Sequence, residues 1–208
     1  AAPVPLTQAQ RYHTATLMQD GSVLVTGGEP SYAATDQFQP VGNVTVSSLD
    51  MTSGRFSHTA TLLPSGKVLL AGGQYPPGTI LNTAELFDAY SGTFTATAAM
   101  SSVRGSHTST LLTDGTVLIA GGVNGFALKT AERYDPSTGN FTAAASLTTK
   151  RDHHTATPLA TGTVLITGDN EAHGATRSED PCAPTPGPPP PRPRTPQTTP
   201  ATPATAAK

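Results

Sequence analysis

The chain has 208 residues, a formal net charge of −2 and only 12% charged residues. This weak charge excludes the strongly basic surface of a nucleic-acid-binding domain, and no apolar run approaches the length of a transmembrane helix. We therefore expect no nucleic-acid partner and no membrane insertion. The start of the sequence lacks the basic and apolar regions of a signal peptide, and Cys182, as the only cysteine, excludes an intrachain disulfide.

One motif occurs four times along the chain: a strand led by histidine, a tight turn, and an apolar strand that ends in glycine. The copies begin at His13, His58, His107 and His154, which are 45, 49 and 47 residues apart. A period of roughly 40–50 residues predicts stacked blades or a solenoid rather than independent domains.

Each copy is predicted to be a β-hairpin. Turn pairs such as Asp20-Gly21 and Asp114-Gly115 separate the two strands, because glycine accepts the positive φ that a tight turn requires. The second strand, residues 68–71 in the second copy, is apolar on both faces and is expected to be buried on both sides. The first strand carries small residues, which suits a place where neighbouring sheets crowd together, as at the axis of a propeller.

Further strands are predicted after the hairpins, where β-prone segments are joined by turn residues. The predicted third and fourth strands are residues 36–38 and 43–46 in the first unit, 84–88 and 92–95 in the second, and 131–135 and 140–142 in the third. Helical periodicity is absent from the chain. The sequence therefore predicts an all-β fold.

These motifs resemble the kelch-repeat family, and specifically its bacterial secreted type, which is related to the propeller of galactose-oxidase-like proteins. The resemblance rests on Arg-x-x-His-Thr, Asp-Gly-x-Val-Leu, the Gly-Gly pair and Ala-Glu-x-Tyr/Phe-Asp, and it covers Leu6 to Asp180. The chain departs from the family pattern at Gln10, which replaces the first arginine, and at Phe94 and Phe141, which replace a late tryptophan. The resemblance implies a β-propeller of four-stranded blades.

The implied organisation is a kelch-repeat propeller over residues 1–180 and a disordered Pro/Thr-rich linker or tail over residues 181–208. The units fall at 7–51, 52–100, 101–147 and 148–180, with residues 1–6 as the end strand of a preceding or closing blade. This organisation gives three and a half to four blades, whereas propellers close with about 4–8.

Two architectures are compatible with this blade number. Residues 1–6 could supply the outer strand of the fourth blade and close a four-bladed ring. Alternatively, the chain is part of a larger ring that is truncated or is completed by another chain. We favour the incomplete ring, whose exposed apolar blade face would invite self-association.

The repeated histidines and arginines are candidate site residues. The four histidines could form a ring of metal ligands, but a residue repeated in every blade usually serves each blade in the same way, so we expect packing and no metal. Arg55, Arg104 and Arg151 could form a ring that binds an acidic peptide or an anion. We favour a structural role, in which each arginine pairs with a carboxylate such as Glu85 or Glu132, or with backbone carbonyls.

The loops after each Gly-Gly break the repeat and are stronger candidates, because binding residues often lie in variable loops on a rigid scaffold. Tyr32, Tyr75 and Phe126 could form an aromatic platform for a sugar or a peptide, or each could pack within its own loop. His173 and two nearby carboxylates form a candidate ligand-binding or cation cluster, although a solvated loop is the simpler interpretation.

Familiar enzyme motifs are absent: there is no Gly-x-Ser-x-Gly elbow, no phosphate-binding loop and no His-Glu-x-x-His. The resemblance implies a copper site with a tyrosine–cysteine crosslink in the catalytic members of the galactose-oxidase-like group. Cys182 lies in the Pro-rich tail and no tyrosine motif can be matched to it. We therefore expect no enzyme activity and no cofactor.

The functional expectation is a non-enzymatic, extracytoplasmic scaffold that binds a protein or glycan ligand through the loop face of a kelch propeller. One alternative is a propeller segment of a larger secreted galactose-oxidase-like or carbohydrate-active enzyme, inactive by itself. Another is a purely structural surface array on a Pro/Thr-rich stalk. Copper ligands elsewhere in a longer reading frame would favour the first alternative.

Overall fold

The computed structural model describes residue 6 and residues 9–40, 44–47 and 50–168. These residues form β-strands and loops and contain no helix, which confirms the predicted all-β fold. Within the same residues there is accordingly no helix that could cross a membrane. Of the predicted end strand at residues 1–6, only Leu6 is described, and it is not part of a strand. The later part of the fourth unit from residue 169 and the predicted tail at 181–208 lie outside the described residues.

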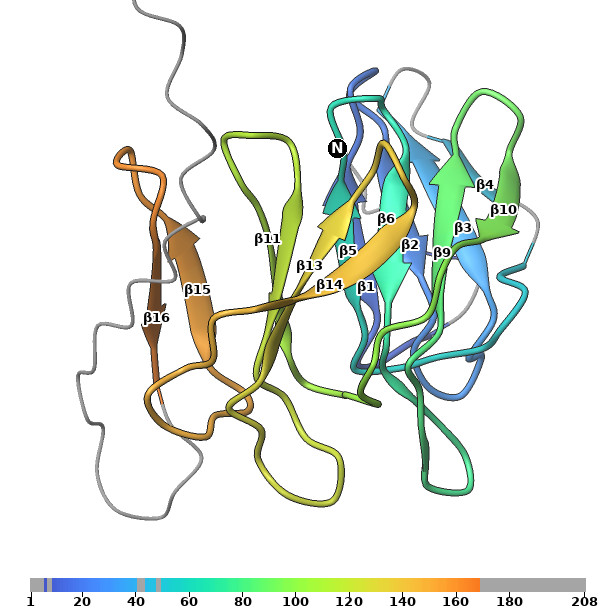
Figure 1. Cartoon of the computed structure of the whole chain (residues 1–208). Helices are drawn as coiled ribbons and strands as arrows, with labels where there is room; N and C mark the ends of the chain where they lie inside the picture. Colours follow the sequence, from blue (N-terminus) through green and yellow to red (C-terminus); the bar gives the residue numbers. More distant parts are fainter. Residues whose placement is uncertain (1–5, 7–8, 41–43, 48–49, 169–208) are drawn as a thin grey trace, which may run out of the picture.

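Three four-stranded antiparallel sheets follow one another along the chain (Figure 1). The first sheet contains β1 (Thr14–Leu17), β2 (Val23–Thr26), β3 (Thr35–Gln39) and β4 (Val44–Ser47). The second contains β5 (Thr59–Leu62), β6 (Val68–Ala71), β9 (Ala84–Asp88) and β10 (Thr93–Ala96). The third contains β11 (Thr108–Leu111), β12 (Val117–Ala120), β13 (Ala131–Asp135) and β14 (Asn140–Ala144). Each sheet forms one unit of the repeat.

Two further hairpins complete the described strands. The fourth unit contributes β15 (Thr155–Pro158) and β16 (Val164–Thr167), which pair in the same register as the other inner hairpins. A short hairpin of β7 (Gln74–Tyr75) and β8 (Thr79–Ile80) forms the loop between β6 and β9. The predicted third and fourth strands of the first three units are confirmed, with ends that differ by one or two residues.

The repeated hairpin has the geometry that its sequence predicts. In the second unit Leu63 N donates to Lys67 O at 2.8 Å, and Gly66 has a φ of 83° in the turn. All four residues of β6 are buried, because β6 lies between β5 and β9 within its sheet and between neighbouring sheets across its faces. The predicted burial of this strand on both sides is therefore confirmed.

The hydrophobic core lies between successive sheets. One cluster joins the first and second units through Met18, Leu24 and Phe87, among others. A second cluster places Leu63 and Leu69 of the second unit with Val117, Ile119 and Tyr134 of the third, and a third cluster repeats this arrangement between the third and fourth units. Phe94 and Phe141, at the expected tryptophan positions, pack against Phe87 and Tyr134 with ring centroids 4.9 Å apart.

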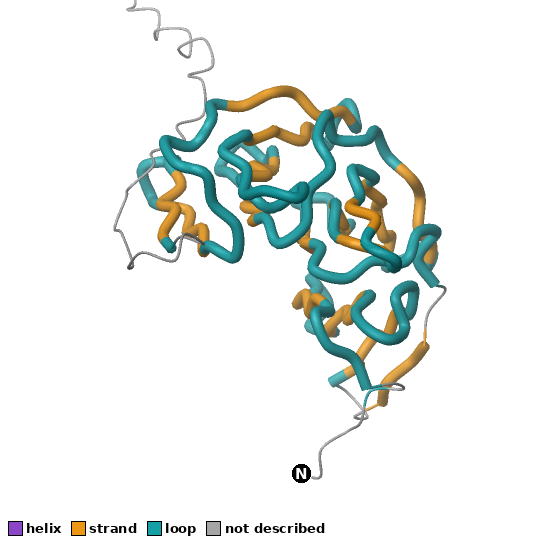
Figure 2. The backbone as a smooth tube through the Cα atoms, turned by 90° about the horizontal axis from the view of Figure 1, so that it is seen from below, coloured by secondary structure: helices purple, strands orange, loops and turns teal. Residues whose placement is uncertain are grey.

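The units are arranged side by side as an open arc (Figure 2). Their first strands contact one another in the order β1, β5, β11, β15, as expected for strands that crowd near an axis. In Figure 2 the first unit lies at one end of the arc and the β15–β16 hairpin lies at the other. The described residues therefore form three blade-like sheets, the inner hairpin of a fourth unit and the short β7–β8 hairpin.

A series of backbone hydrogen bonds links the units at one repeated position. Ser57 N donates to Tyr12 O at 3.0 Å, Ser106 N donates to Ser57 O at 3.0 Å, and His153 N donates to Ser106 O at 3.1 Å. All four residues have a positive φ, 59° at Tyr12 and 51° at the other three. This conformation costs a non-glycine residue about 1–2 kcal/mol, so the links between units hold the chain in a geometry that it would otherwise avoid.

Candidate functional site

The repeated arginines lie inside the units. Arg55 Nη2 lies 2.6 Å from Glu85 Oε1 and Nη1 donates to the carbonyl of Gly72, with the whole side chain buried. Arg104 makes the equivalent ion pair with Glu132 at 2.8 Å. These are the contacts of the favoured structural interpretation.

Arg151 is also fully buried and donates to the carbonyl of Gly168. The alternative in which Arg55, Arg104 and Arg151 present a cationic ring to a ligand is therefore corrected. Their side chains have no exposed surface with which to contact an acidic peptide or an anion.

Three of the repeated histidines bridge neighbouring units. Nε2 of His58 lies 3.1 Å from the hydroxyl oxygens of both Thr14 and Thr26 in the first unit. His107 and His154 each place Nε2 2.9 Å from a threonine hydroxyl of the preceding unit. Among the described residues, no group of three or more His, Cys, Asp or Glu side chains could hold a metal ion.

Burial keeps these bridging histidines neutral. It lowers the pKa of His58 well below the ordinary value, and the positive charge of Arg55 acts in the same direction. Burial, aided by Arg104, lowers the pKa of His107 to about 3, and burial with Arg151 lowers the pKa of His154 to about 4. A neutral ring that contacts threonine hydroxyls fits a packing role between units.

In the first three units, backbone bonds on the loop face join the loop after Gly-Gly to the segment that leads into the repeated histidine. Phe56 and Gln74 exchange N–H···O bonds of 2.9 and 2.8 Å, and Arg11 pairs with Glu29 in the same way. Tyr32 O accepts a 2.7 Å bond from Arg55 N. The loops of the first and second units are thus fixed against one another.

An aromatic cluster occupies this junction. The rings of Tyr32 and Tyr75 meet edge to face with centroids 5.6 Å apart, and Tyr32 contacts Phe56 at 5.8 Å. Phe56 contacts Tyr12 at 6.2 Å, and the Arg11 guanidinium lies 5.6 Å from the centroid of the Tyr12 ring. Two of the three predicted platform residues, Tyr32 and Tyr75, therefore lie together although they come from different units.

Glycine is required between the two tyrosines. A Cβ at Gly54 would lie 2.9 Å from Cβ of Tyr32 and 3.0 Å from Cε2 of Tyr75. Such distances are too short for a side chain, so any larger residue at this position has to displace one of the rings. Gly54 thereby sets the spacing of the pair.

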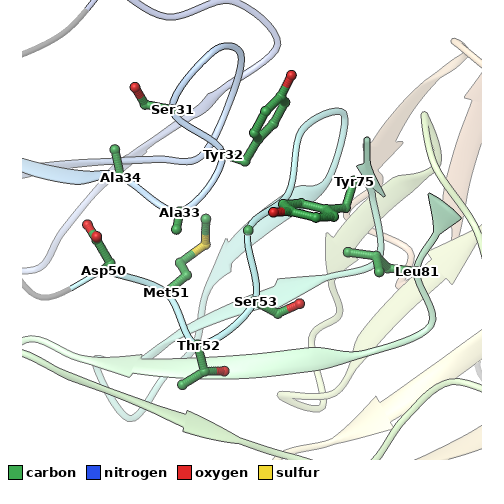
Figure 3. A pocket seen from close by; sticks show the side chains of 11 residues that line it. Ser31, Tyr32, Ala33, Ala34, Asp50, Met51, Thr52, Ser53, Tyr75 and Leu81 are labelled. Atoms are coloured by element: carbon green, nitrogen blue, oxygen red, sulfur yellow. The ribbon is translucent and has the colours of Figure 1, made fainter. Parts of the chain in front are cut away.

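The tyrosines border an open recess of about 550 Å³ (Figure 3). Figure 3 shows Tyr32 and Tyr75 facing each other beside the segment that carries Thr52 and Ser53, with Asp50 further along it. Glu85 anchors this segment, because its carboxylate accepts bonds from Thr52 N at 2.8 Å and from Ser53 N at 3.2 Å. The recess thus offers aromatic edges, hydroxyl groups and one exposed carboxylate to a ligand.

The other predicted site residues do not join this recess. Phe126 is 81% exposed at the tip of the third unit's loop, and no ring contact is found for it among the described residues. His173 lies outside the described residues. The three-residue platform is therefore reduced to the Tyr32–Tyr75 pair.

Phe56 and Tyr12 were missed because both lie inside the repeated motif. Phe56 stands between Arg55 and His58, where the third unit has Gly105. It therefore breaks the repeat in the same sense as the loop residues do. Comparison of the variable positions within each motif would have identified it.

A protein-family model described as Kelch motif matches residues 104–148. The third unit carries a Kelch motif. The match runs from Arg104 through β11, β12, β13 and β14 to the segment after Leu147. No curated protein matches the chain. The predicted kelch resemblance is thus supported for one complete unit. The first and second units share its strand order, and all four inner hairpins share one register.

Proposed function

We propose that this protein is a non-enzymatic binding scaffold whose loop face holds a protein or glycan ligand in the recess beside Tyr32 and Tyr75. The observation that supports the proposal is the edge-to-face contact of these two rings across the junction of two units. Aromatic rings offer large, rigid contact area at low entropy cost, and their hydroxyl groups keep a polar edge toward solvent.

The polar neighbours suit the same task. Ser53 presents a hydroxyl group beside the rings, and Asp50 adds a carboxylate at the edge of the recess, whereas the Thr52 hydroxyl donates to Glu85. A sugar ring or an extended peptide could lie against Tyr75, which is 46% exposed, while its polar groups bond to these side chains. The underlying strands are buried and give the loops a rigid support.

The test is a glycan and peptide array probed with the natural chain and with two variants. Tyr75→Ala should lose at least tenfold in affinity for any ligand found, because about half of the ring is available for contact. Phe126→Ala is the matched control, since it removes an even more exposed aromatic residue that lies outside the cluster. Both variants should melt within a few degrees of the natural chain. Retained binding by Tyr75→Ala would show that the recess is not the site.

A second candidate is a propeller segment of a larger secreted enzyme of the galactose-oxidase-like or carbohydrate-active kind. The open arc of the described units favours it, because a complete ring would need further blades. In that case the chain is inactive alone, and the loop face helps to hold the substrate. Expression together with any neighbouring domains, followed by an oxidase assay with added copper, separates the two candidates.

An extracytoplasmic location is part of the proposal. It is supported by the bacterial secreted type that the repeats resemble and by the Pro/Thr-rich composition of residues 181–208, which suits a stalk outside the cell. Immunodetection in secreted and cytoplasmic fractions tests it directly. A protein found only in the cytoplasmic fraction would contradict the proposed location.

A further inference from the structure

The three interfaces between units share one construction. The earlier unit contributes a leucine or methionine that follows its first strand, namely Met18, Leu63 or Leu112. The later unit contributes the two inward residues of its second strand, which are Val68 and Leu70, Val117 and Ile119, or Val164 and Ile166. The structure thus contains three examples of how one unit binds the next.

Polar contacts repeat at the same interfaces. At each junction a histidine of the later unit places Nε2 against a threonine of the first strand in the earlier unit. At the first junction Thr14 and Thr26 stand 2.8 Å apart, hydroxyl to hydroxyl, and His58 contacts both. At this junction a threonine pair receives the histidine, whereas at the other two junctions a single threonine, Thr59 or Thr108, does so.

The second, third and fourth units each use one face to contact the unit before them. On the first unit, none of the described units covers the corresponding face. Leu17 on this face is 66% exposed, whereas its equivalents Leu62 and Leu111 pack against the core clusters. His13 is exposed, although the other three repeated histidines are buried. This end therefore presents two exposed residues of the inserting half of an interface, the histidine and the leucine.

The fourth unit has the complementary face. Leu159 is 41% exposed, whereas Leu63 and Leu112 at the same position are 2% and 8% exposed. Thr155 and Thr167 stand 2.8 Å apart, hydroxyl to hydroxyl, which is the same arrangement that receives His58 in the first unit. This end therefore carries the receiving half of an interface.

We propose that the first-unit face of one chain binds the fourth-unit face of a second copy of the same chain. His13 of one copy then contacts the Thr155–Thr167 pair of the other, and Leu17 and Leu159 become buried in the contact. The occupant is inferred from continuity, because the new interface repeats the construction that the chain already contains three times. No charged side chain stands among these contact residues, so no ion has to be desolvated.

Such a contact is heterologous, so it generates a ring if the rotation closes and an open filament if it does not. Two copies joined at both ends would bring six four-stranded sheets and two inner hairpins of a fourth unit together. Whether or not each hairpin is counted as a blade, the total lies within the range of about 4–8 blades over which propellers close. A closed dimer of two arcs is therefore the expected assembly.

Sedimentation velocity of the full chain over its soluble concentration range tests the proposal. The natural chain should form a dimer. Leu17→Asp and Leu159→Asp should each weaken association at least tenfold without unfolding the monomer, because both side chains are already largely exposed. Phe126→Asp is the matched control, since it places the same charge on an exposed hydrophobic position away from both faces, and it should leave association unchanged.

A mixing experiment distinguishes end-to-end binding from other contacts. Leu17→Asp retains an intact fourth-unit face and Leu159→Asp retains an intact first-unit face, so the two monomeric variants should form a one-to-one complex when mixed. His13→Ala in the Leu159→Asp variant should weaken that complex. A natural chain that stays monomeric, a failure of the two variants to combine, or equal disruption by Phe126→Asp would each overturn the proposal.

Discussion

Arg55 Nη2 donates to Glu85 Oε1 at 2.6 Å, and both side chains are buried. The same carboxylate accepts the backbone N–H groups of Thr52 and Ser53, which line the loop-face recess. Glu85 therefore connects the interior of the second sheet to the proposed ligand site. Glu132 repeats the arrangement in the third unit, with bonds from Arg104, Ser101 N and Ser102 N.

Glu85→Gln should lower both stability and ligand affinity. Removing one partner of a buried ion pair leaves an uncompensated charge and costs about 3–5 kcal/mol, which denaturant unfolding would measure. Glu132→Gln is the matched variant: it should lose similar stability but keep ligand affinity, because its segment lies outside the recess. Equal affinity loss in both variants would mean that Glu85 has no specific role in holding the recess.

Gly54→Ala should weaken ligand binding by changing the spacing of the Tyr32–Tyr75 pair. The added Cβ would stand 2.9 Å from Cβ of Tyr32 and 3.0 Å from Cε2 of Tyr75, so rotation of the Tyr75 ring alone cannot make room for it. Ligand titration of the purified variant measures the effect. Gly92→Ala is the control, because it has nothing within 4 Å of the added carbon and lies in the β9–β10 turn, outside the residues that line the recess, so it should bind normally.

Gly72→Ala should severely destabilise the second unit. Gly72 has a φ of +59°, and a Cβ there would lie 2.4 Å from the carbonyl oxygen of Arg104 in the next unit. Gly92 has a similar φ of +67° with open space around it, so Gly92→Ala should cost only about 1 kcal/mol of backbone strain. Thermal unfolding of the two variants separates the effect of the clash with Arg104 from the effect of a positive φ alone. Similar melting temperatures would show that the neighbouring unit moves to accommodate the added Cβ.

The stability of the protein should decrease as the pH falls from about 6.5. The pKa of His107 is about 3 and that of His154 about 4 in the folded chain, both below the ordinary value of 6.5. The unfolded chain therefore binds more protons between the folded and unfolded values, and the stability present above pH 6.5 is lost progressively toward pH 3–4.

Urea unfolding at several pH values above about 5 measures this effect, because aspartates whose pKa lies below 3.8, such as Asp88 and Asp135, stay ionised there. His107→Asn should flatten the curve relative to the natural chain. A natural chain whose free energy of unfolding is constant over this pH range would contradict the lowered pKa values of His107 and His154.

Most of the fold could be predicted because each unit repeats the same hairpin motif. The turn glycines, the apolar run at residues 68–71 and the spacing of the histidines all point to one hairpin, and the structure has that hairpin four times. The structural role of Arg55 and Arg104 could also be predicted from repetition. A residue that recurs in every blade usually does the same job in each, whereas a ligand site usually depends on residues that differ between blades. Their burial confirms it.

The site was only partly predictable, because loop residues meet through the arrangement of units and not through sequence spacing. Tyr32 and Tyr75 come from equivalent loops and meet across a unit boundary. In the third unit Val123 pairs with Gly105, and Asn124 comes next, where the second unit has Tyr75 after Gln74. Phe126 comes later in the loop, and its exposed ring lies apart from the aromatic cluster. Phe56 occupies a variable position of the repeated Arg-x-x-His motif, whose other residues have structural roles, so the motif alone does not indicate a place in the site.

The linear order of contacts along β1, β5, β11 and β15 has a consequence for cooperativity. A unit flanked on both sides can open only by breaking two interfaces, whereas an end unit breaks one. Amide hydrogen exchange should therefore be slowest in β6 and β12 and fastest in the β15–β16 hairpin. Joining the two ends of the array would give every unit two neighbours and would make the exchange rates of the four hairpins more alike.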